Sequence, residues 1–266
     1  MAIYVDSLRI GCVKYLNARP LIRGWPGNVE FDHPSALCQR LARGQLDVAL
    51  VSSFEFLRNP TYRIIDRVSI SSDGLVHSVV VAHRGAFSDI EQIELDPASE
   101  TAANLLRCLL AEFGLTARLT GGYSKGAGLS RARLIIGDQA IRFRQNHADA
   151  YQFWDLGEQW KKLIGLPFVF ALWLIRPEVR DAKSIAQRLR ELRDENLADI
   201  AAIVSDAVAD AAHNKQIIIQ EFLDRYYHEY LRFGFGAREK QGLQTFADLC
   251  AKHGVLPKRG HDFSLV

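Results

Sequence analysis

Residues 75–83 read LVHSVVVAH, and residues 167–175 read PFVFALWLI. Both stretches are apolar and rich in β-branched or aromatic side chains, which predicts long buried strands. They bracket a segment that has strands and helices of its own. If both strands cross between two lobes as a hinge, residues 83–172 form an inserted lobe 2, and residues 1–82 with 173–266 form a discontinuous lobe 1. Such a division leaves a cleft between the lobes, where small ligands commonly bind.

Around these strands, short apolar stretches alternate with helical patterns, which predicts an α/β protein. From Asp181 onward, apolar residues recur at helical spacing, and no comparable strand follows. The last third of the chain is therefore expected to be a helical tail that belongs to lobe 1. Further strands are expected at 8–13, 29–31 and 92–95, at the start of 47–57 and of 118–130, and at 133–138.

Composition excludes several classes of partner. The chain has 266 residues, of which 33 are basic and 31 acidic, and its net charge of +2 gives no reason to expect nucleic acid or an anionic membrane as a partner. It contains no apolar run long enough to span a membrane, and its first residues do not resemble a secretory signal. A cytoplasmic protein is expected, and the sequence indicates no oligomeric state.

Cysteine and glycine patterns are equally unspecific. Cys12, Cys38, Cys108 and Cys250 form no CxxC pair and no Cys/His metal spacing, so we expect reduced, buried thiols and no metal site, with a reactive Cys12 as the alternative. No P-loop, GxSxG or HExxH motif occurs. The stretch GGYSKGAG at 121–128 predicts a loop or lid, and a phosphate cradle around Lys125 is its less favoured interpretation.

Four segments place small polar groups at the carboxyl end of a predicted strand. In open α/β sheets, ligands bind outside these strand ends, where helix N-termini offer free N–H groups to an anion. Each segment alone is explained by a capped helix, and Asn17 and Asp138 are expected caps. Together they predict a site for a small molecule with one or two carboxylates. The segments are Lys14–Asn17, Ser52–Ser53, Ser99–Thr101 and Gly137–Asp138.

Five segments resemble chorismate dehydratase, an enzyme family of the futalosine route of menaquinone biosynthesis. The similarity runs in order from about residue 8 to 175, and the YLN-x-x-PL and GLPFVFA-x-W patterns are specific in combination. A sister family, 1,4-dihydroxy-6-naphthoate synthase, is similar in fold. The segments are KYLNARPL (14–21), DVALVSSFEFL (47–57), DGLVHSVVV (73–81), LIIGDQAI (134–141) and DLGEQWKKLIGLPFVFALW (155–173).

The resemblance implies a periplasmic-binding-protein type II fold and a cofactor-free hydro-lyase. Chorismate would lose its C3 proton and C4 hydroxyl to give 3-[(1-carboxyvinyl)oxy]benzoate and water. Asn17 matches the key Asn of the family and Ser78 its key Ser, which implies that they are catalytic. Neither is a strong base, so we expect them to orient the substrate and to hydrogen-bond the leaving hydroxyl.

The sequence departs from the family pattern at one helix start. The usual hydroxyl-rich stretch is reduced here to Ser99 and Thr101, and Glu100 between them would repel an anion if it pointed inward. We expect Lys14 to replace the lost hydroxyls as a carboxylate partner, a solvated Lys14 being the alternative. With Ser52 and Asp138 these residues form the predicted substrate site. Phe168 is expected to add an apolar wall.

Two other functions stay open on the sequence alone. The fold is shared with transport receptors, so a non-catalytic carboxylate-binding protein is one. The sister synthase is the other, and it would need a histidine in the cleft. His77 adjoins the site strand, but the sequence does not place it there.

Overall fold

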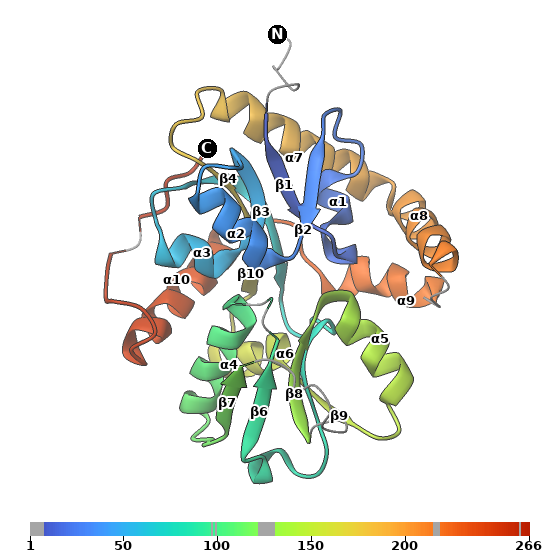
Figure 1. Ribbon diagram of the computed structural model, residues 1–266, viewed down its shortest axis with the longest axis vertical. Coiled ribbons are helices and arrows are strands. Elements are labelled where there is room, and N and C mark those ends of the chain that lie inside the picture. The colour runs from blue at the N-terminus through green and yellow to red at the C-terminus, as the bar shows by residue number, and fades with distance from the viewer. Residues whose placement is uncertain (1–7, 97, 99, 122–130, 215–218, 261) are drawn as a thin grey trace.

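The computed structural model describes residues 8–96, 98, 100–121, 131–214, 219–260 and 262–266. It has two lobes, each built on a five-stranded β-sheet that is flanked by helices (Figure 1). One large cluster of buried apolar side chains runs through both lobes. The two halves therefore share a core in the observed arrangement.

The sheet of the first lobe has the strand order β2-β1-β3-β10-β4. Strand β1 (Ile10–Val13) runs parallel to β2 (Val29–Asp32) and to β3 (Val48–Ser52). Strand β10 (Phe168–Ile175) runs antiparallel to β3 and to β4 (Arg63–Ser72). Every residue of β1 and β3 is buried, as expected for strands that are covered on both faces.

The sheet of the second lobe has the order β7-β6-β8-β5-β9. Strand β6 (Gln92–Leu95) runs parallel to β7 (Arg118–Gly121) and β8 (Ala132–Ile136). Strand β5 (Val79–His83) runs antiparallel to β8 and to β9 (Gln152–Asp155). The two sheets thus share one plan, in which a single antiparallel strand is inserted next to an edge strand.

In each sheet the antiparallel strand directly follows a segment in which the chain passes from one lobe to the other. Strand β5 lies wholly in the second sheet and β10 wholly in the first. The chain therefore crosses at residues 73–78 and 165–167, ahead of the two expected hinge strands and not along them. The predicted lobe boundaries, at 82/83 and 172/173, therefore lie a few residues after these crossings.

Helices follow most of the parallel strands, so their N-termini gather at the edge of each sheet that faces the other lobe. Helix α2 begins at Pro34, whose fixed φ suits a first turn. The helices of the lobes are α1 (Arg19–Ile22), α2 (Pro34–Ala42), α3 (Ser53–Arg58), α4 (Glu100–Glu112), α5 (Gly137–His147) and α6 (Leu156–Ile164), with the 3-10 turns η2 (Leu16–Ala18) and η3 (Phe87–Asp89).

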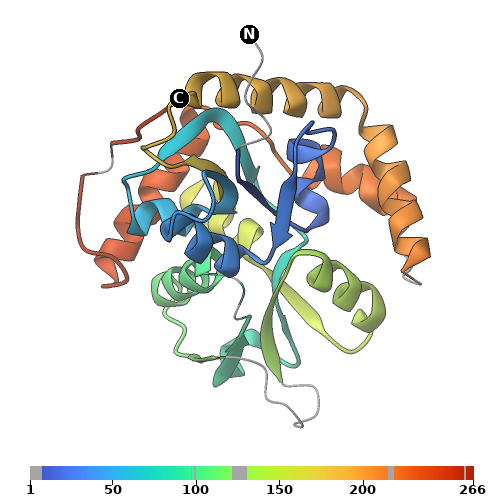
Figure 2. The same ribbon diagram turned by 45° about the horizontal axis from the view of Figure 1, so that its top comes forward.

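The helical tail contacts both lobes. Helix α7 packs against α1 and β4 of the first lobe, whereas α10 packs against β10 of the first lobe and α4 of the second. Figures 1 and 2 show α9 and α10 on opposite sides of the junction between the lobes. The tail comprises α7 (Ala182–Ala198), α8 (Ile200–His213), α9 (Gln220–Arg225), the π-helical turn η4 (Tyr226–Tyr230) and α10 (Ala237–Lys252).

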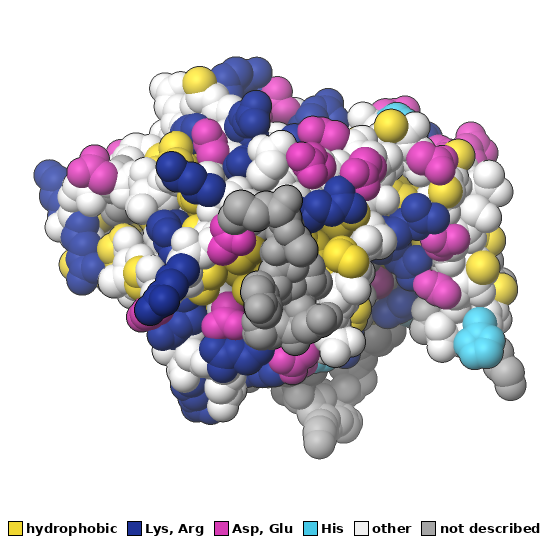
Figure 3. Space-filling model, turned by 90° about the horizontal axis from the view of Figure 1, so that it is seen from above, with side chains coloured by type: hydrophobic (Ala, Val, Ile, Leu, Met, Phe, Trp, Pro, Cys, Tyr) yellow, Lys and Arg dark blue, Asp and Glu magenta, His cyan; other side chains and the backbone are white. Residues whose placement is uncertain are grey.

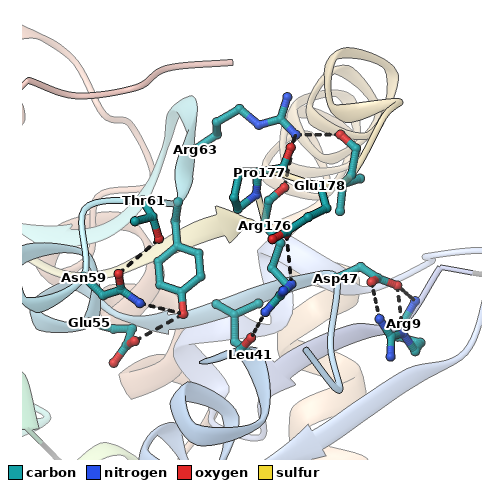
Figure 4. Close-up of polar contacts among 12 residues, drawn as sticks. Arg9, Leu41, Asp47, Glu55, Asn59, Thr61, Arg63, Arg176, Pro177 and Glu178 are labelled. Carbon is teal, nitrogen blue, oxygen red and sulfur yellow. Dashed lines mark hydrogen bonds and ion pairs between the residues drawn. The ribbon is translucent and has the colours of Figure 1, made fainter. Parts of the chain in front are cut away.

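Polar contacts hold the loops together at the far edge of the first sheet, where β3 and β4 begin and β10 ends (Figure 4). Arg176 Nη1 donates to the carbonyl oxygen of Leu41 at 2.8 Å, and Arg63 Nη2 donates to that of Arg176 at 3.1 Å. Arg9 Nε donates to Asp47 Oδ2 at 3.0 Å. These bonds fix the end of the lobe that lies away from the cleft.

The outer surface over α7 mixes both signs of charge (Figure 3). Arg188 pairs there with Glu195 at 2.7 Å. No helix within the described ranges combines the length and the apolarity that crossing a bilayer requires. All four cysteines are buried and free, as predicted. Burial raises the pKa of the Cys12 thiol, which keeps it protonated and argues against a reactive Cys12.

Candidate functional site

A cavity of about 60 Å³ lies between the lobes, at the carboxyl ends of the parallel strands. All four polar segments predicted from the strand ends contribute to its lining, through Asn17, Ser52, Thr101 and Gly137. The remaining wall is apolar or aromatic. It includes Val13, Tyr15, Pro34, Val79, Ile136 and Phe170.

Hydroxyl groups join the lobes at one end of this cavity. The Ser52 and Thr101 hydroxyls hydrogen-bond each other, and Thr101 Oγ1 also accepts a bond from the Phe54 backbone N–H at 3.1 Å. Ser53 Oγ donates to the carbonyl oxygen of Val169 at 2.7 Å. Because Thr101 belongs to the second lobe and Ser52 and Phe54 to the first, the bonds of Thr101 stabilise the closed arrangement.

Asn17 lies in η2, directly after β1, and it lines the cavity. The prediction that it caps a helix is wrong, because Tyr15 and Ala18 hold the N-cap positions of η2 and α1. Its Oδ1 is buried and has no hydrogen-bond partner among the described residues. An unpaired buried acceptor is costly, so this atom is available to a ligand.

Asp138 anchors the same turn from the second lobe. Its Oδ1 accepts a hydrogen bond from the Leu16 backbone N–H at 3.0 Å. Burial raises the pKa of the Asp138 carboxyl, and the bond from Leu16 opposes this shift. Asp138 does not cap α5, whose N-cap is Ile136. It ties α5 to the residue before Asn17.

Ser78 lies in the crossing segment just before β5 and is fully buried. Its Oγ accepts a hydrogen bond from the Tyr226 hydroxyl at 2.7 Å, and its carbonyl oxygen accepts one from Gly137 N at 2.7 Å. Tyr226 also makes an electrostatic contact with the side chain of Asn17. Ser78 does not itself line the cavity, but the next residue, Val79, does.

The backbone before Ser78 has an uncommon conformation. His77 has a φ of +67°, which costs about 1–3 kcal/mol for a residue with a side chain. The Asp155 carboxylate accepts hydrogen bonds from the backbone N–H groups of His77 at 2.7 Å and Val76 at 3.1 Å, and from that of Glu158 at 3.0 Å. Asp155 thereby holds the crossing segment against the start of α6 and sets the direction of Ser78.

A family model for menaquinone biosynthesis matches residues 8–252. The chain belongs to this family. Chorismate dehydratase of Thermus thermophilus is 28% identical over 260 residues, which cover 90% of this chain and 93% of that protein. Chorismate dehydratase of Campylobacter jejuni is 26% identical over 239 residues, which cover 89% of this chain and 90% of that protein.

A solved structure shows which fold this member of the menaquinone biosynthesis family has. The alkanesulfonate-binding protein SsuA from Xanthomonas axonopodis pv. citri matches it with a TM-score of 0.69 and 16% identity, covering 100% of this chain and 99% of that one. At this identity the likeness concerns the fold alone. It confirms the predicted periplasmic-binding-protein architecture.

The structure describes part of the start of α4, where this chain has fewer hydroxyl groups than the chorismate dehydratase pattern. Glu100 pairs with Arg58, whose Nη1 lies 2.9 Å from Glu100 Oε1, and it does not line the cavity. The expected repulsion of an anion is thus avoided by pairing. Ser99 lies outside the described residues, as does most of the Gly-rich stretch with Lys125.

Lys14 is exposed and lines a different hollow, of about 550 Å³, on the outer side of β1 and β2. Tyr15 lines both hollows, so it stands between Lys14 and the inner cavity. Lys14 therefore does not line the cavity between the lobes in this closed arrangement, and its role as a carboxylate partner stays a prediction.

Phe168 does not line the cavity either. Its ring packs in the core against Trp160, with the ring centroids 5.1 Å apart, and it is fully buried. Phe170 forms the aromatic wall instead. A register shift between Val169 and Ala171 in the pairing of β10 with β4 accompanies this change, and the sequence gives no sign of it.

His77, the candidate for the histidine that the sister synthase would need, also lies outside the cavity lining. The His77 ring lies against Tyr230 and Phe222, with centroid separations of 5.3 and 4.7 Å, and it does not line the cavity. Burial, together with the positive charges of Arg144 and Arg225, lowers the pKa of His77 to about 4. His77 is therefore a neutral packing residue at neutral pH.

This burial predicts a pH dependence of stability. The unfolded chain binds a proton at His77 near pH 6.5 and the folded chain only near pH 4, so the free energy of unfolding should fall as the pH falls through this interval. In His77→Asn, which tolerates a positive φ, that decline should be smaller. Urea unfolding at pH 7, 6, 5 and 4.5 measures the difference, with exposed His228→Asn as the control. Identical pH profiles for wild type and His77→Asn would refute it.

Proposed function

We propose that this chain is a chorismate dehydratase, a hydro-lyase that converts chorismate to 3-[(1-carboxyvinyl)oxy]benzoate and water. The support comes from membership of the menaquinone biosynthesis family and from two relatives of that name that align over most of the chain. The observation that carries the proposal to particular atoms is that Asn17 lines the cavity between the lobes and its Oδ1 has no partner among the described residues. Ser78, which is bonded to Tyr226, directly precedes Val79 in the same lining.

The proposed reaction is an elimination that makes the ring aromatic. The C3–H bond breaks, its electron pair forms the C3–C4 double bond, and the C4–O bond breaks. The departing hydroxide takes up a proton, so the products are the aromatic acid and one water. Aromatisation supplies the driving force, so the protein has to hold the ring in a reactive geometry and direct two protons.

The catalytic roles fall to Asn17 and Ser78 in this proposal. Both make neutral hydrogen bonds, which suits orientation of the substrate and stabilisation of the leaving hydroxyl. Among the described residues that line the cavity there is no Asp, Glu, His or Lys. We therefore assign removal of the C3 proton to a carboxylate of the substrate itself.

Carboxylate binding is assigned to the hydroxyl cluster. In the closed arrangement Thr101 Oγ1 accepts the Phe54 N–H, and Ser52 bonds Thr101. A substrate carboxylate placed here would accept hydrogen bonds from the same N–H and from both hydroxyls, at the start of α3. Ser99 and Asp138 stay proposed members of the substrate site, with Asp138 acting through the backbone of Leu16.

Entry of the substrate requires the lobes to separate. A cavity of about 60 Å³ is far smaller than the roughly 300–1,000 Å³ of sites that enclose small ligands. The two crossing segments, residues 73–78 and 165–167, are where such a motion would bend. We propose lobe 1 (1–82 and 173–266) and lobe 2 (83–172) as the two parts that move, with the bends a few residues before these boundaries.

Incubation of the purified chain with chorismate tests the function. We expect an aromatic product, seen by its ultraviolet absorbance and by a mass lower than that of chorismate by one water. Chorismate bound in calorimetry without turnover would instead support a non-catalytic carboxylate-binding protein. A cytoplasmic location remains a prediction, which the four free, buried cysteines favour.

A further inference from the structure

A π-helical turn in the tail contacts both segments that carry the proposed catalytic groups. Three tyrosines of η4 make these contacts. Tyr227 donates to the carbonyl oxygen of Leu16 at 2.8 Å, next to Asn17. Tyr230 stacks on His77, next to Ser78. Tyr226 lies between the two segments and bonds Ser78 directly. Single π-helical turns occur frequently at functional sites, because they redirect side chains out of the α-helical register.

The hydrogen bond of the Tyr226 hydroxyl has a direction. A phenol has one proton, and Tyr226 gives it to Ser78 Oγ. The Asn17 side chain makes an electrostatic contact with the Tyr226 hydroxyl, and its Oδ1 has no hydrogen-bond partner among the described residues. The directed hydrogen bond of the Tyr226 hydroxyl is therefore the one to Ser78.

This direction determines what Ser78 can offer to a substrate. Ser78 Oγ accepts the hydrogen bond from Tyr226, so its own O–H is left as a donor. Asn17, whose side chain lines the cavity, has an Oδ1 without a partner among the described residues.

We propose that Tyr226 is a positioning residue, which fixes the Ser78 hydroxyl as a donor to the leaving oxygen of the substrate. This inference rests on the proposed dehydratase function. Without the phenol, the Ser78 hydroxyl is free to turn its proton toward a backbone acceptor. Tyr226 is fully buried, and burial raises its pKa, so the phenol keeps its proton throughout the range in which the enzyme would work.

Tyr226→Phe tests the inference, because it removes only the hydroxyl and keeps the ring. We expect kcat for chorismate to fall by about tenfold or more, with KM changed less than about threefold, since the lost bond acts on the transition state. In the Ser78→Ala background, Tyr226→Phe should lower kcat by less than about twofold further, because residues that act as one unit are not additive.

A matched control is Tyr62→Phe. Tyr62 is also buried, and its hydroxyl donates to Glu55 Oε1 at 3.4 Å, away from the cavity. We expect this variant to keep wild-type kcat. A merely structural role for Tyr226 predicts an equal fall in kcat with and without Ser78, and that additive result would overturn the inference. An active wild type with an unaffected Tyr226→Phe would overturn it as well, leaving the dehydratase function intact. A wild type that leaves chorismate unchanged would overturn the function and, with it, the inference.

Discussion

Asn17→Ala should lower kcat for chorismate by about a hundredfold or more and leave the thermal midpoint nearly unchanged. Removing one preorganised hydrogen-bonding group from a site that stabilises developing charge costs about 10²–10³ in rate. The effect on folding should be small, because Asn17 caps no helix and its Oδ1 has no partner among the described residues. Its loss removes a desolvated, unpaired atom, which offsets the packing contacts that are lost with the side chain.

Steady-state kinetics with chorismate and a thermal melt of each variant measure the two effects. Asn146→Ala is a suitable control, since Asn146 is exposed near the end of α5. It should match wild type in both measurements. An Asn17→Ala variant whose kcat stays within about tenfold of wild type would remove Asn17 from the catalytic role.

The largest loss of stability is expected from Asp155→Ala. The side chain is buried and accepts three backbone hydrogen bonds, from Val76, His77 and Glu158. Alanine leaves these donors unpaired, each at about 1–3 kcal/mol, and releases the strained backbone at His77. We expect the free energy of unfolding to fall by more than about 3 kcal/mol. Activity should fall too, because Ser78 follows directly.

Two companion variants make this prediction specific. Asp155→Asn keeps one acceptor oxygen and should lose less than Asp155→Ala; since burial raises the pKa of Asp155, its charge is not expected to be the main contribution. Asp199 is also an N-cap, of α8, and accepts only the Ala202 N–H at 3.2 Å. Asp199→Ala should cost about 1 kcal/mol. Equal losses for Asp155→Ala and Asp199→Ala in urea unfolding would contradict the proposed anchoring role.

Most elements of the fold could be predicted from local patterns, and the misses have identifiable causes. Strands β4 and β9 were not predicted. In β4 the apolar alternation is interrupted at Asp66–Arg67, where Arg67 has a φ of +65°. Strand β9 has only four residues. Their places in the sheets come from pairing with β10 and β5, far away in the sequence.

The candidate site was predicted in part. Asn17, Ser52, Thr101 and the start of α5 meet because carboxyl ends of parallel strands share one edge of a sheet, a rule that can be applied to sequence. Lys14 and Phe168 do not line the cavity. The rule could not show this, since it gives the position of a residue along the chain and not the direction of its side chain. Tyr226 was missed altogether. Its only signal was the aromatic density of YYHEY at 226–230, in a tail expected to be plain helix.

The amino-acid sequence by itself determined a two-lobed α/β chain with a helical tail, reduced buried cysteines and polar groups gathered at the strand ends. The periodic spacing of apolar residues and the residues that start helices depend on a few neighbouring positions, so both can be recognised without knowing the fold. Only the tertiary structure decided that the tail returns to the junction and bonds Tyr226 to Ser78 and Tyr227 to the backbone of Leu16. That choice depends on packing between residues more than a hundred positions apart and on one π-helical turn, neither of which any local pattern encodes.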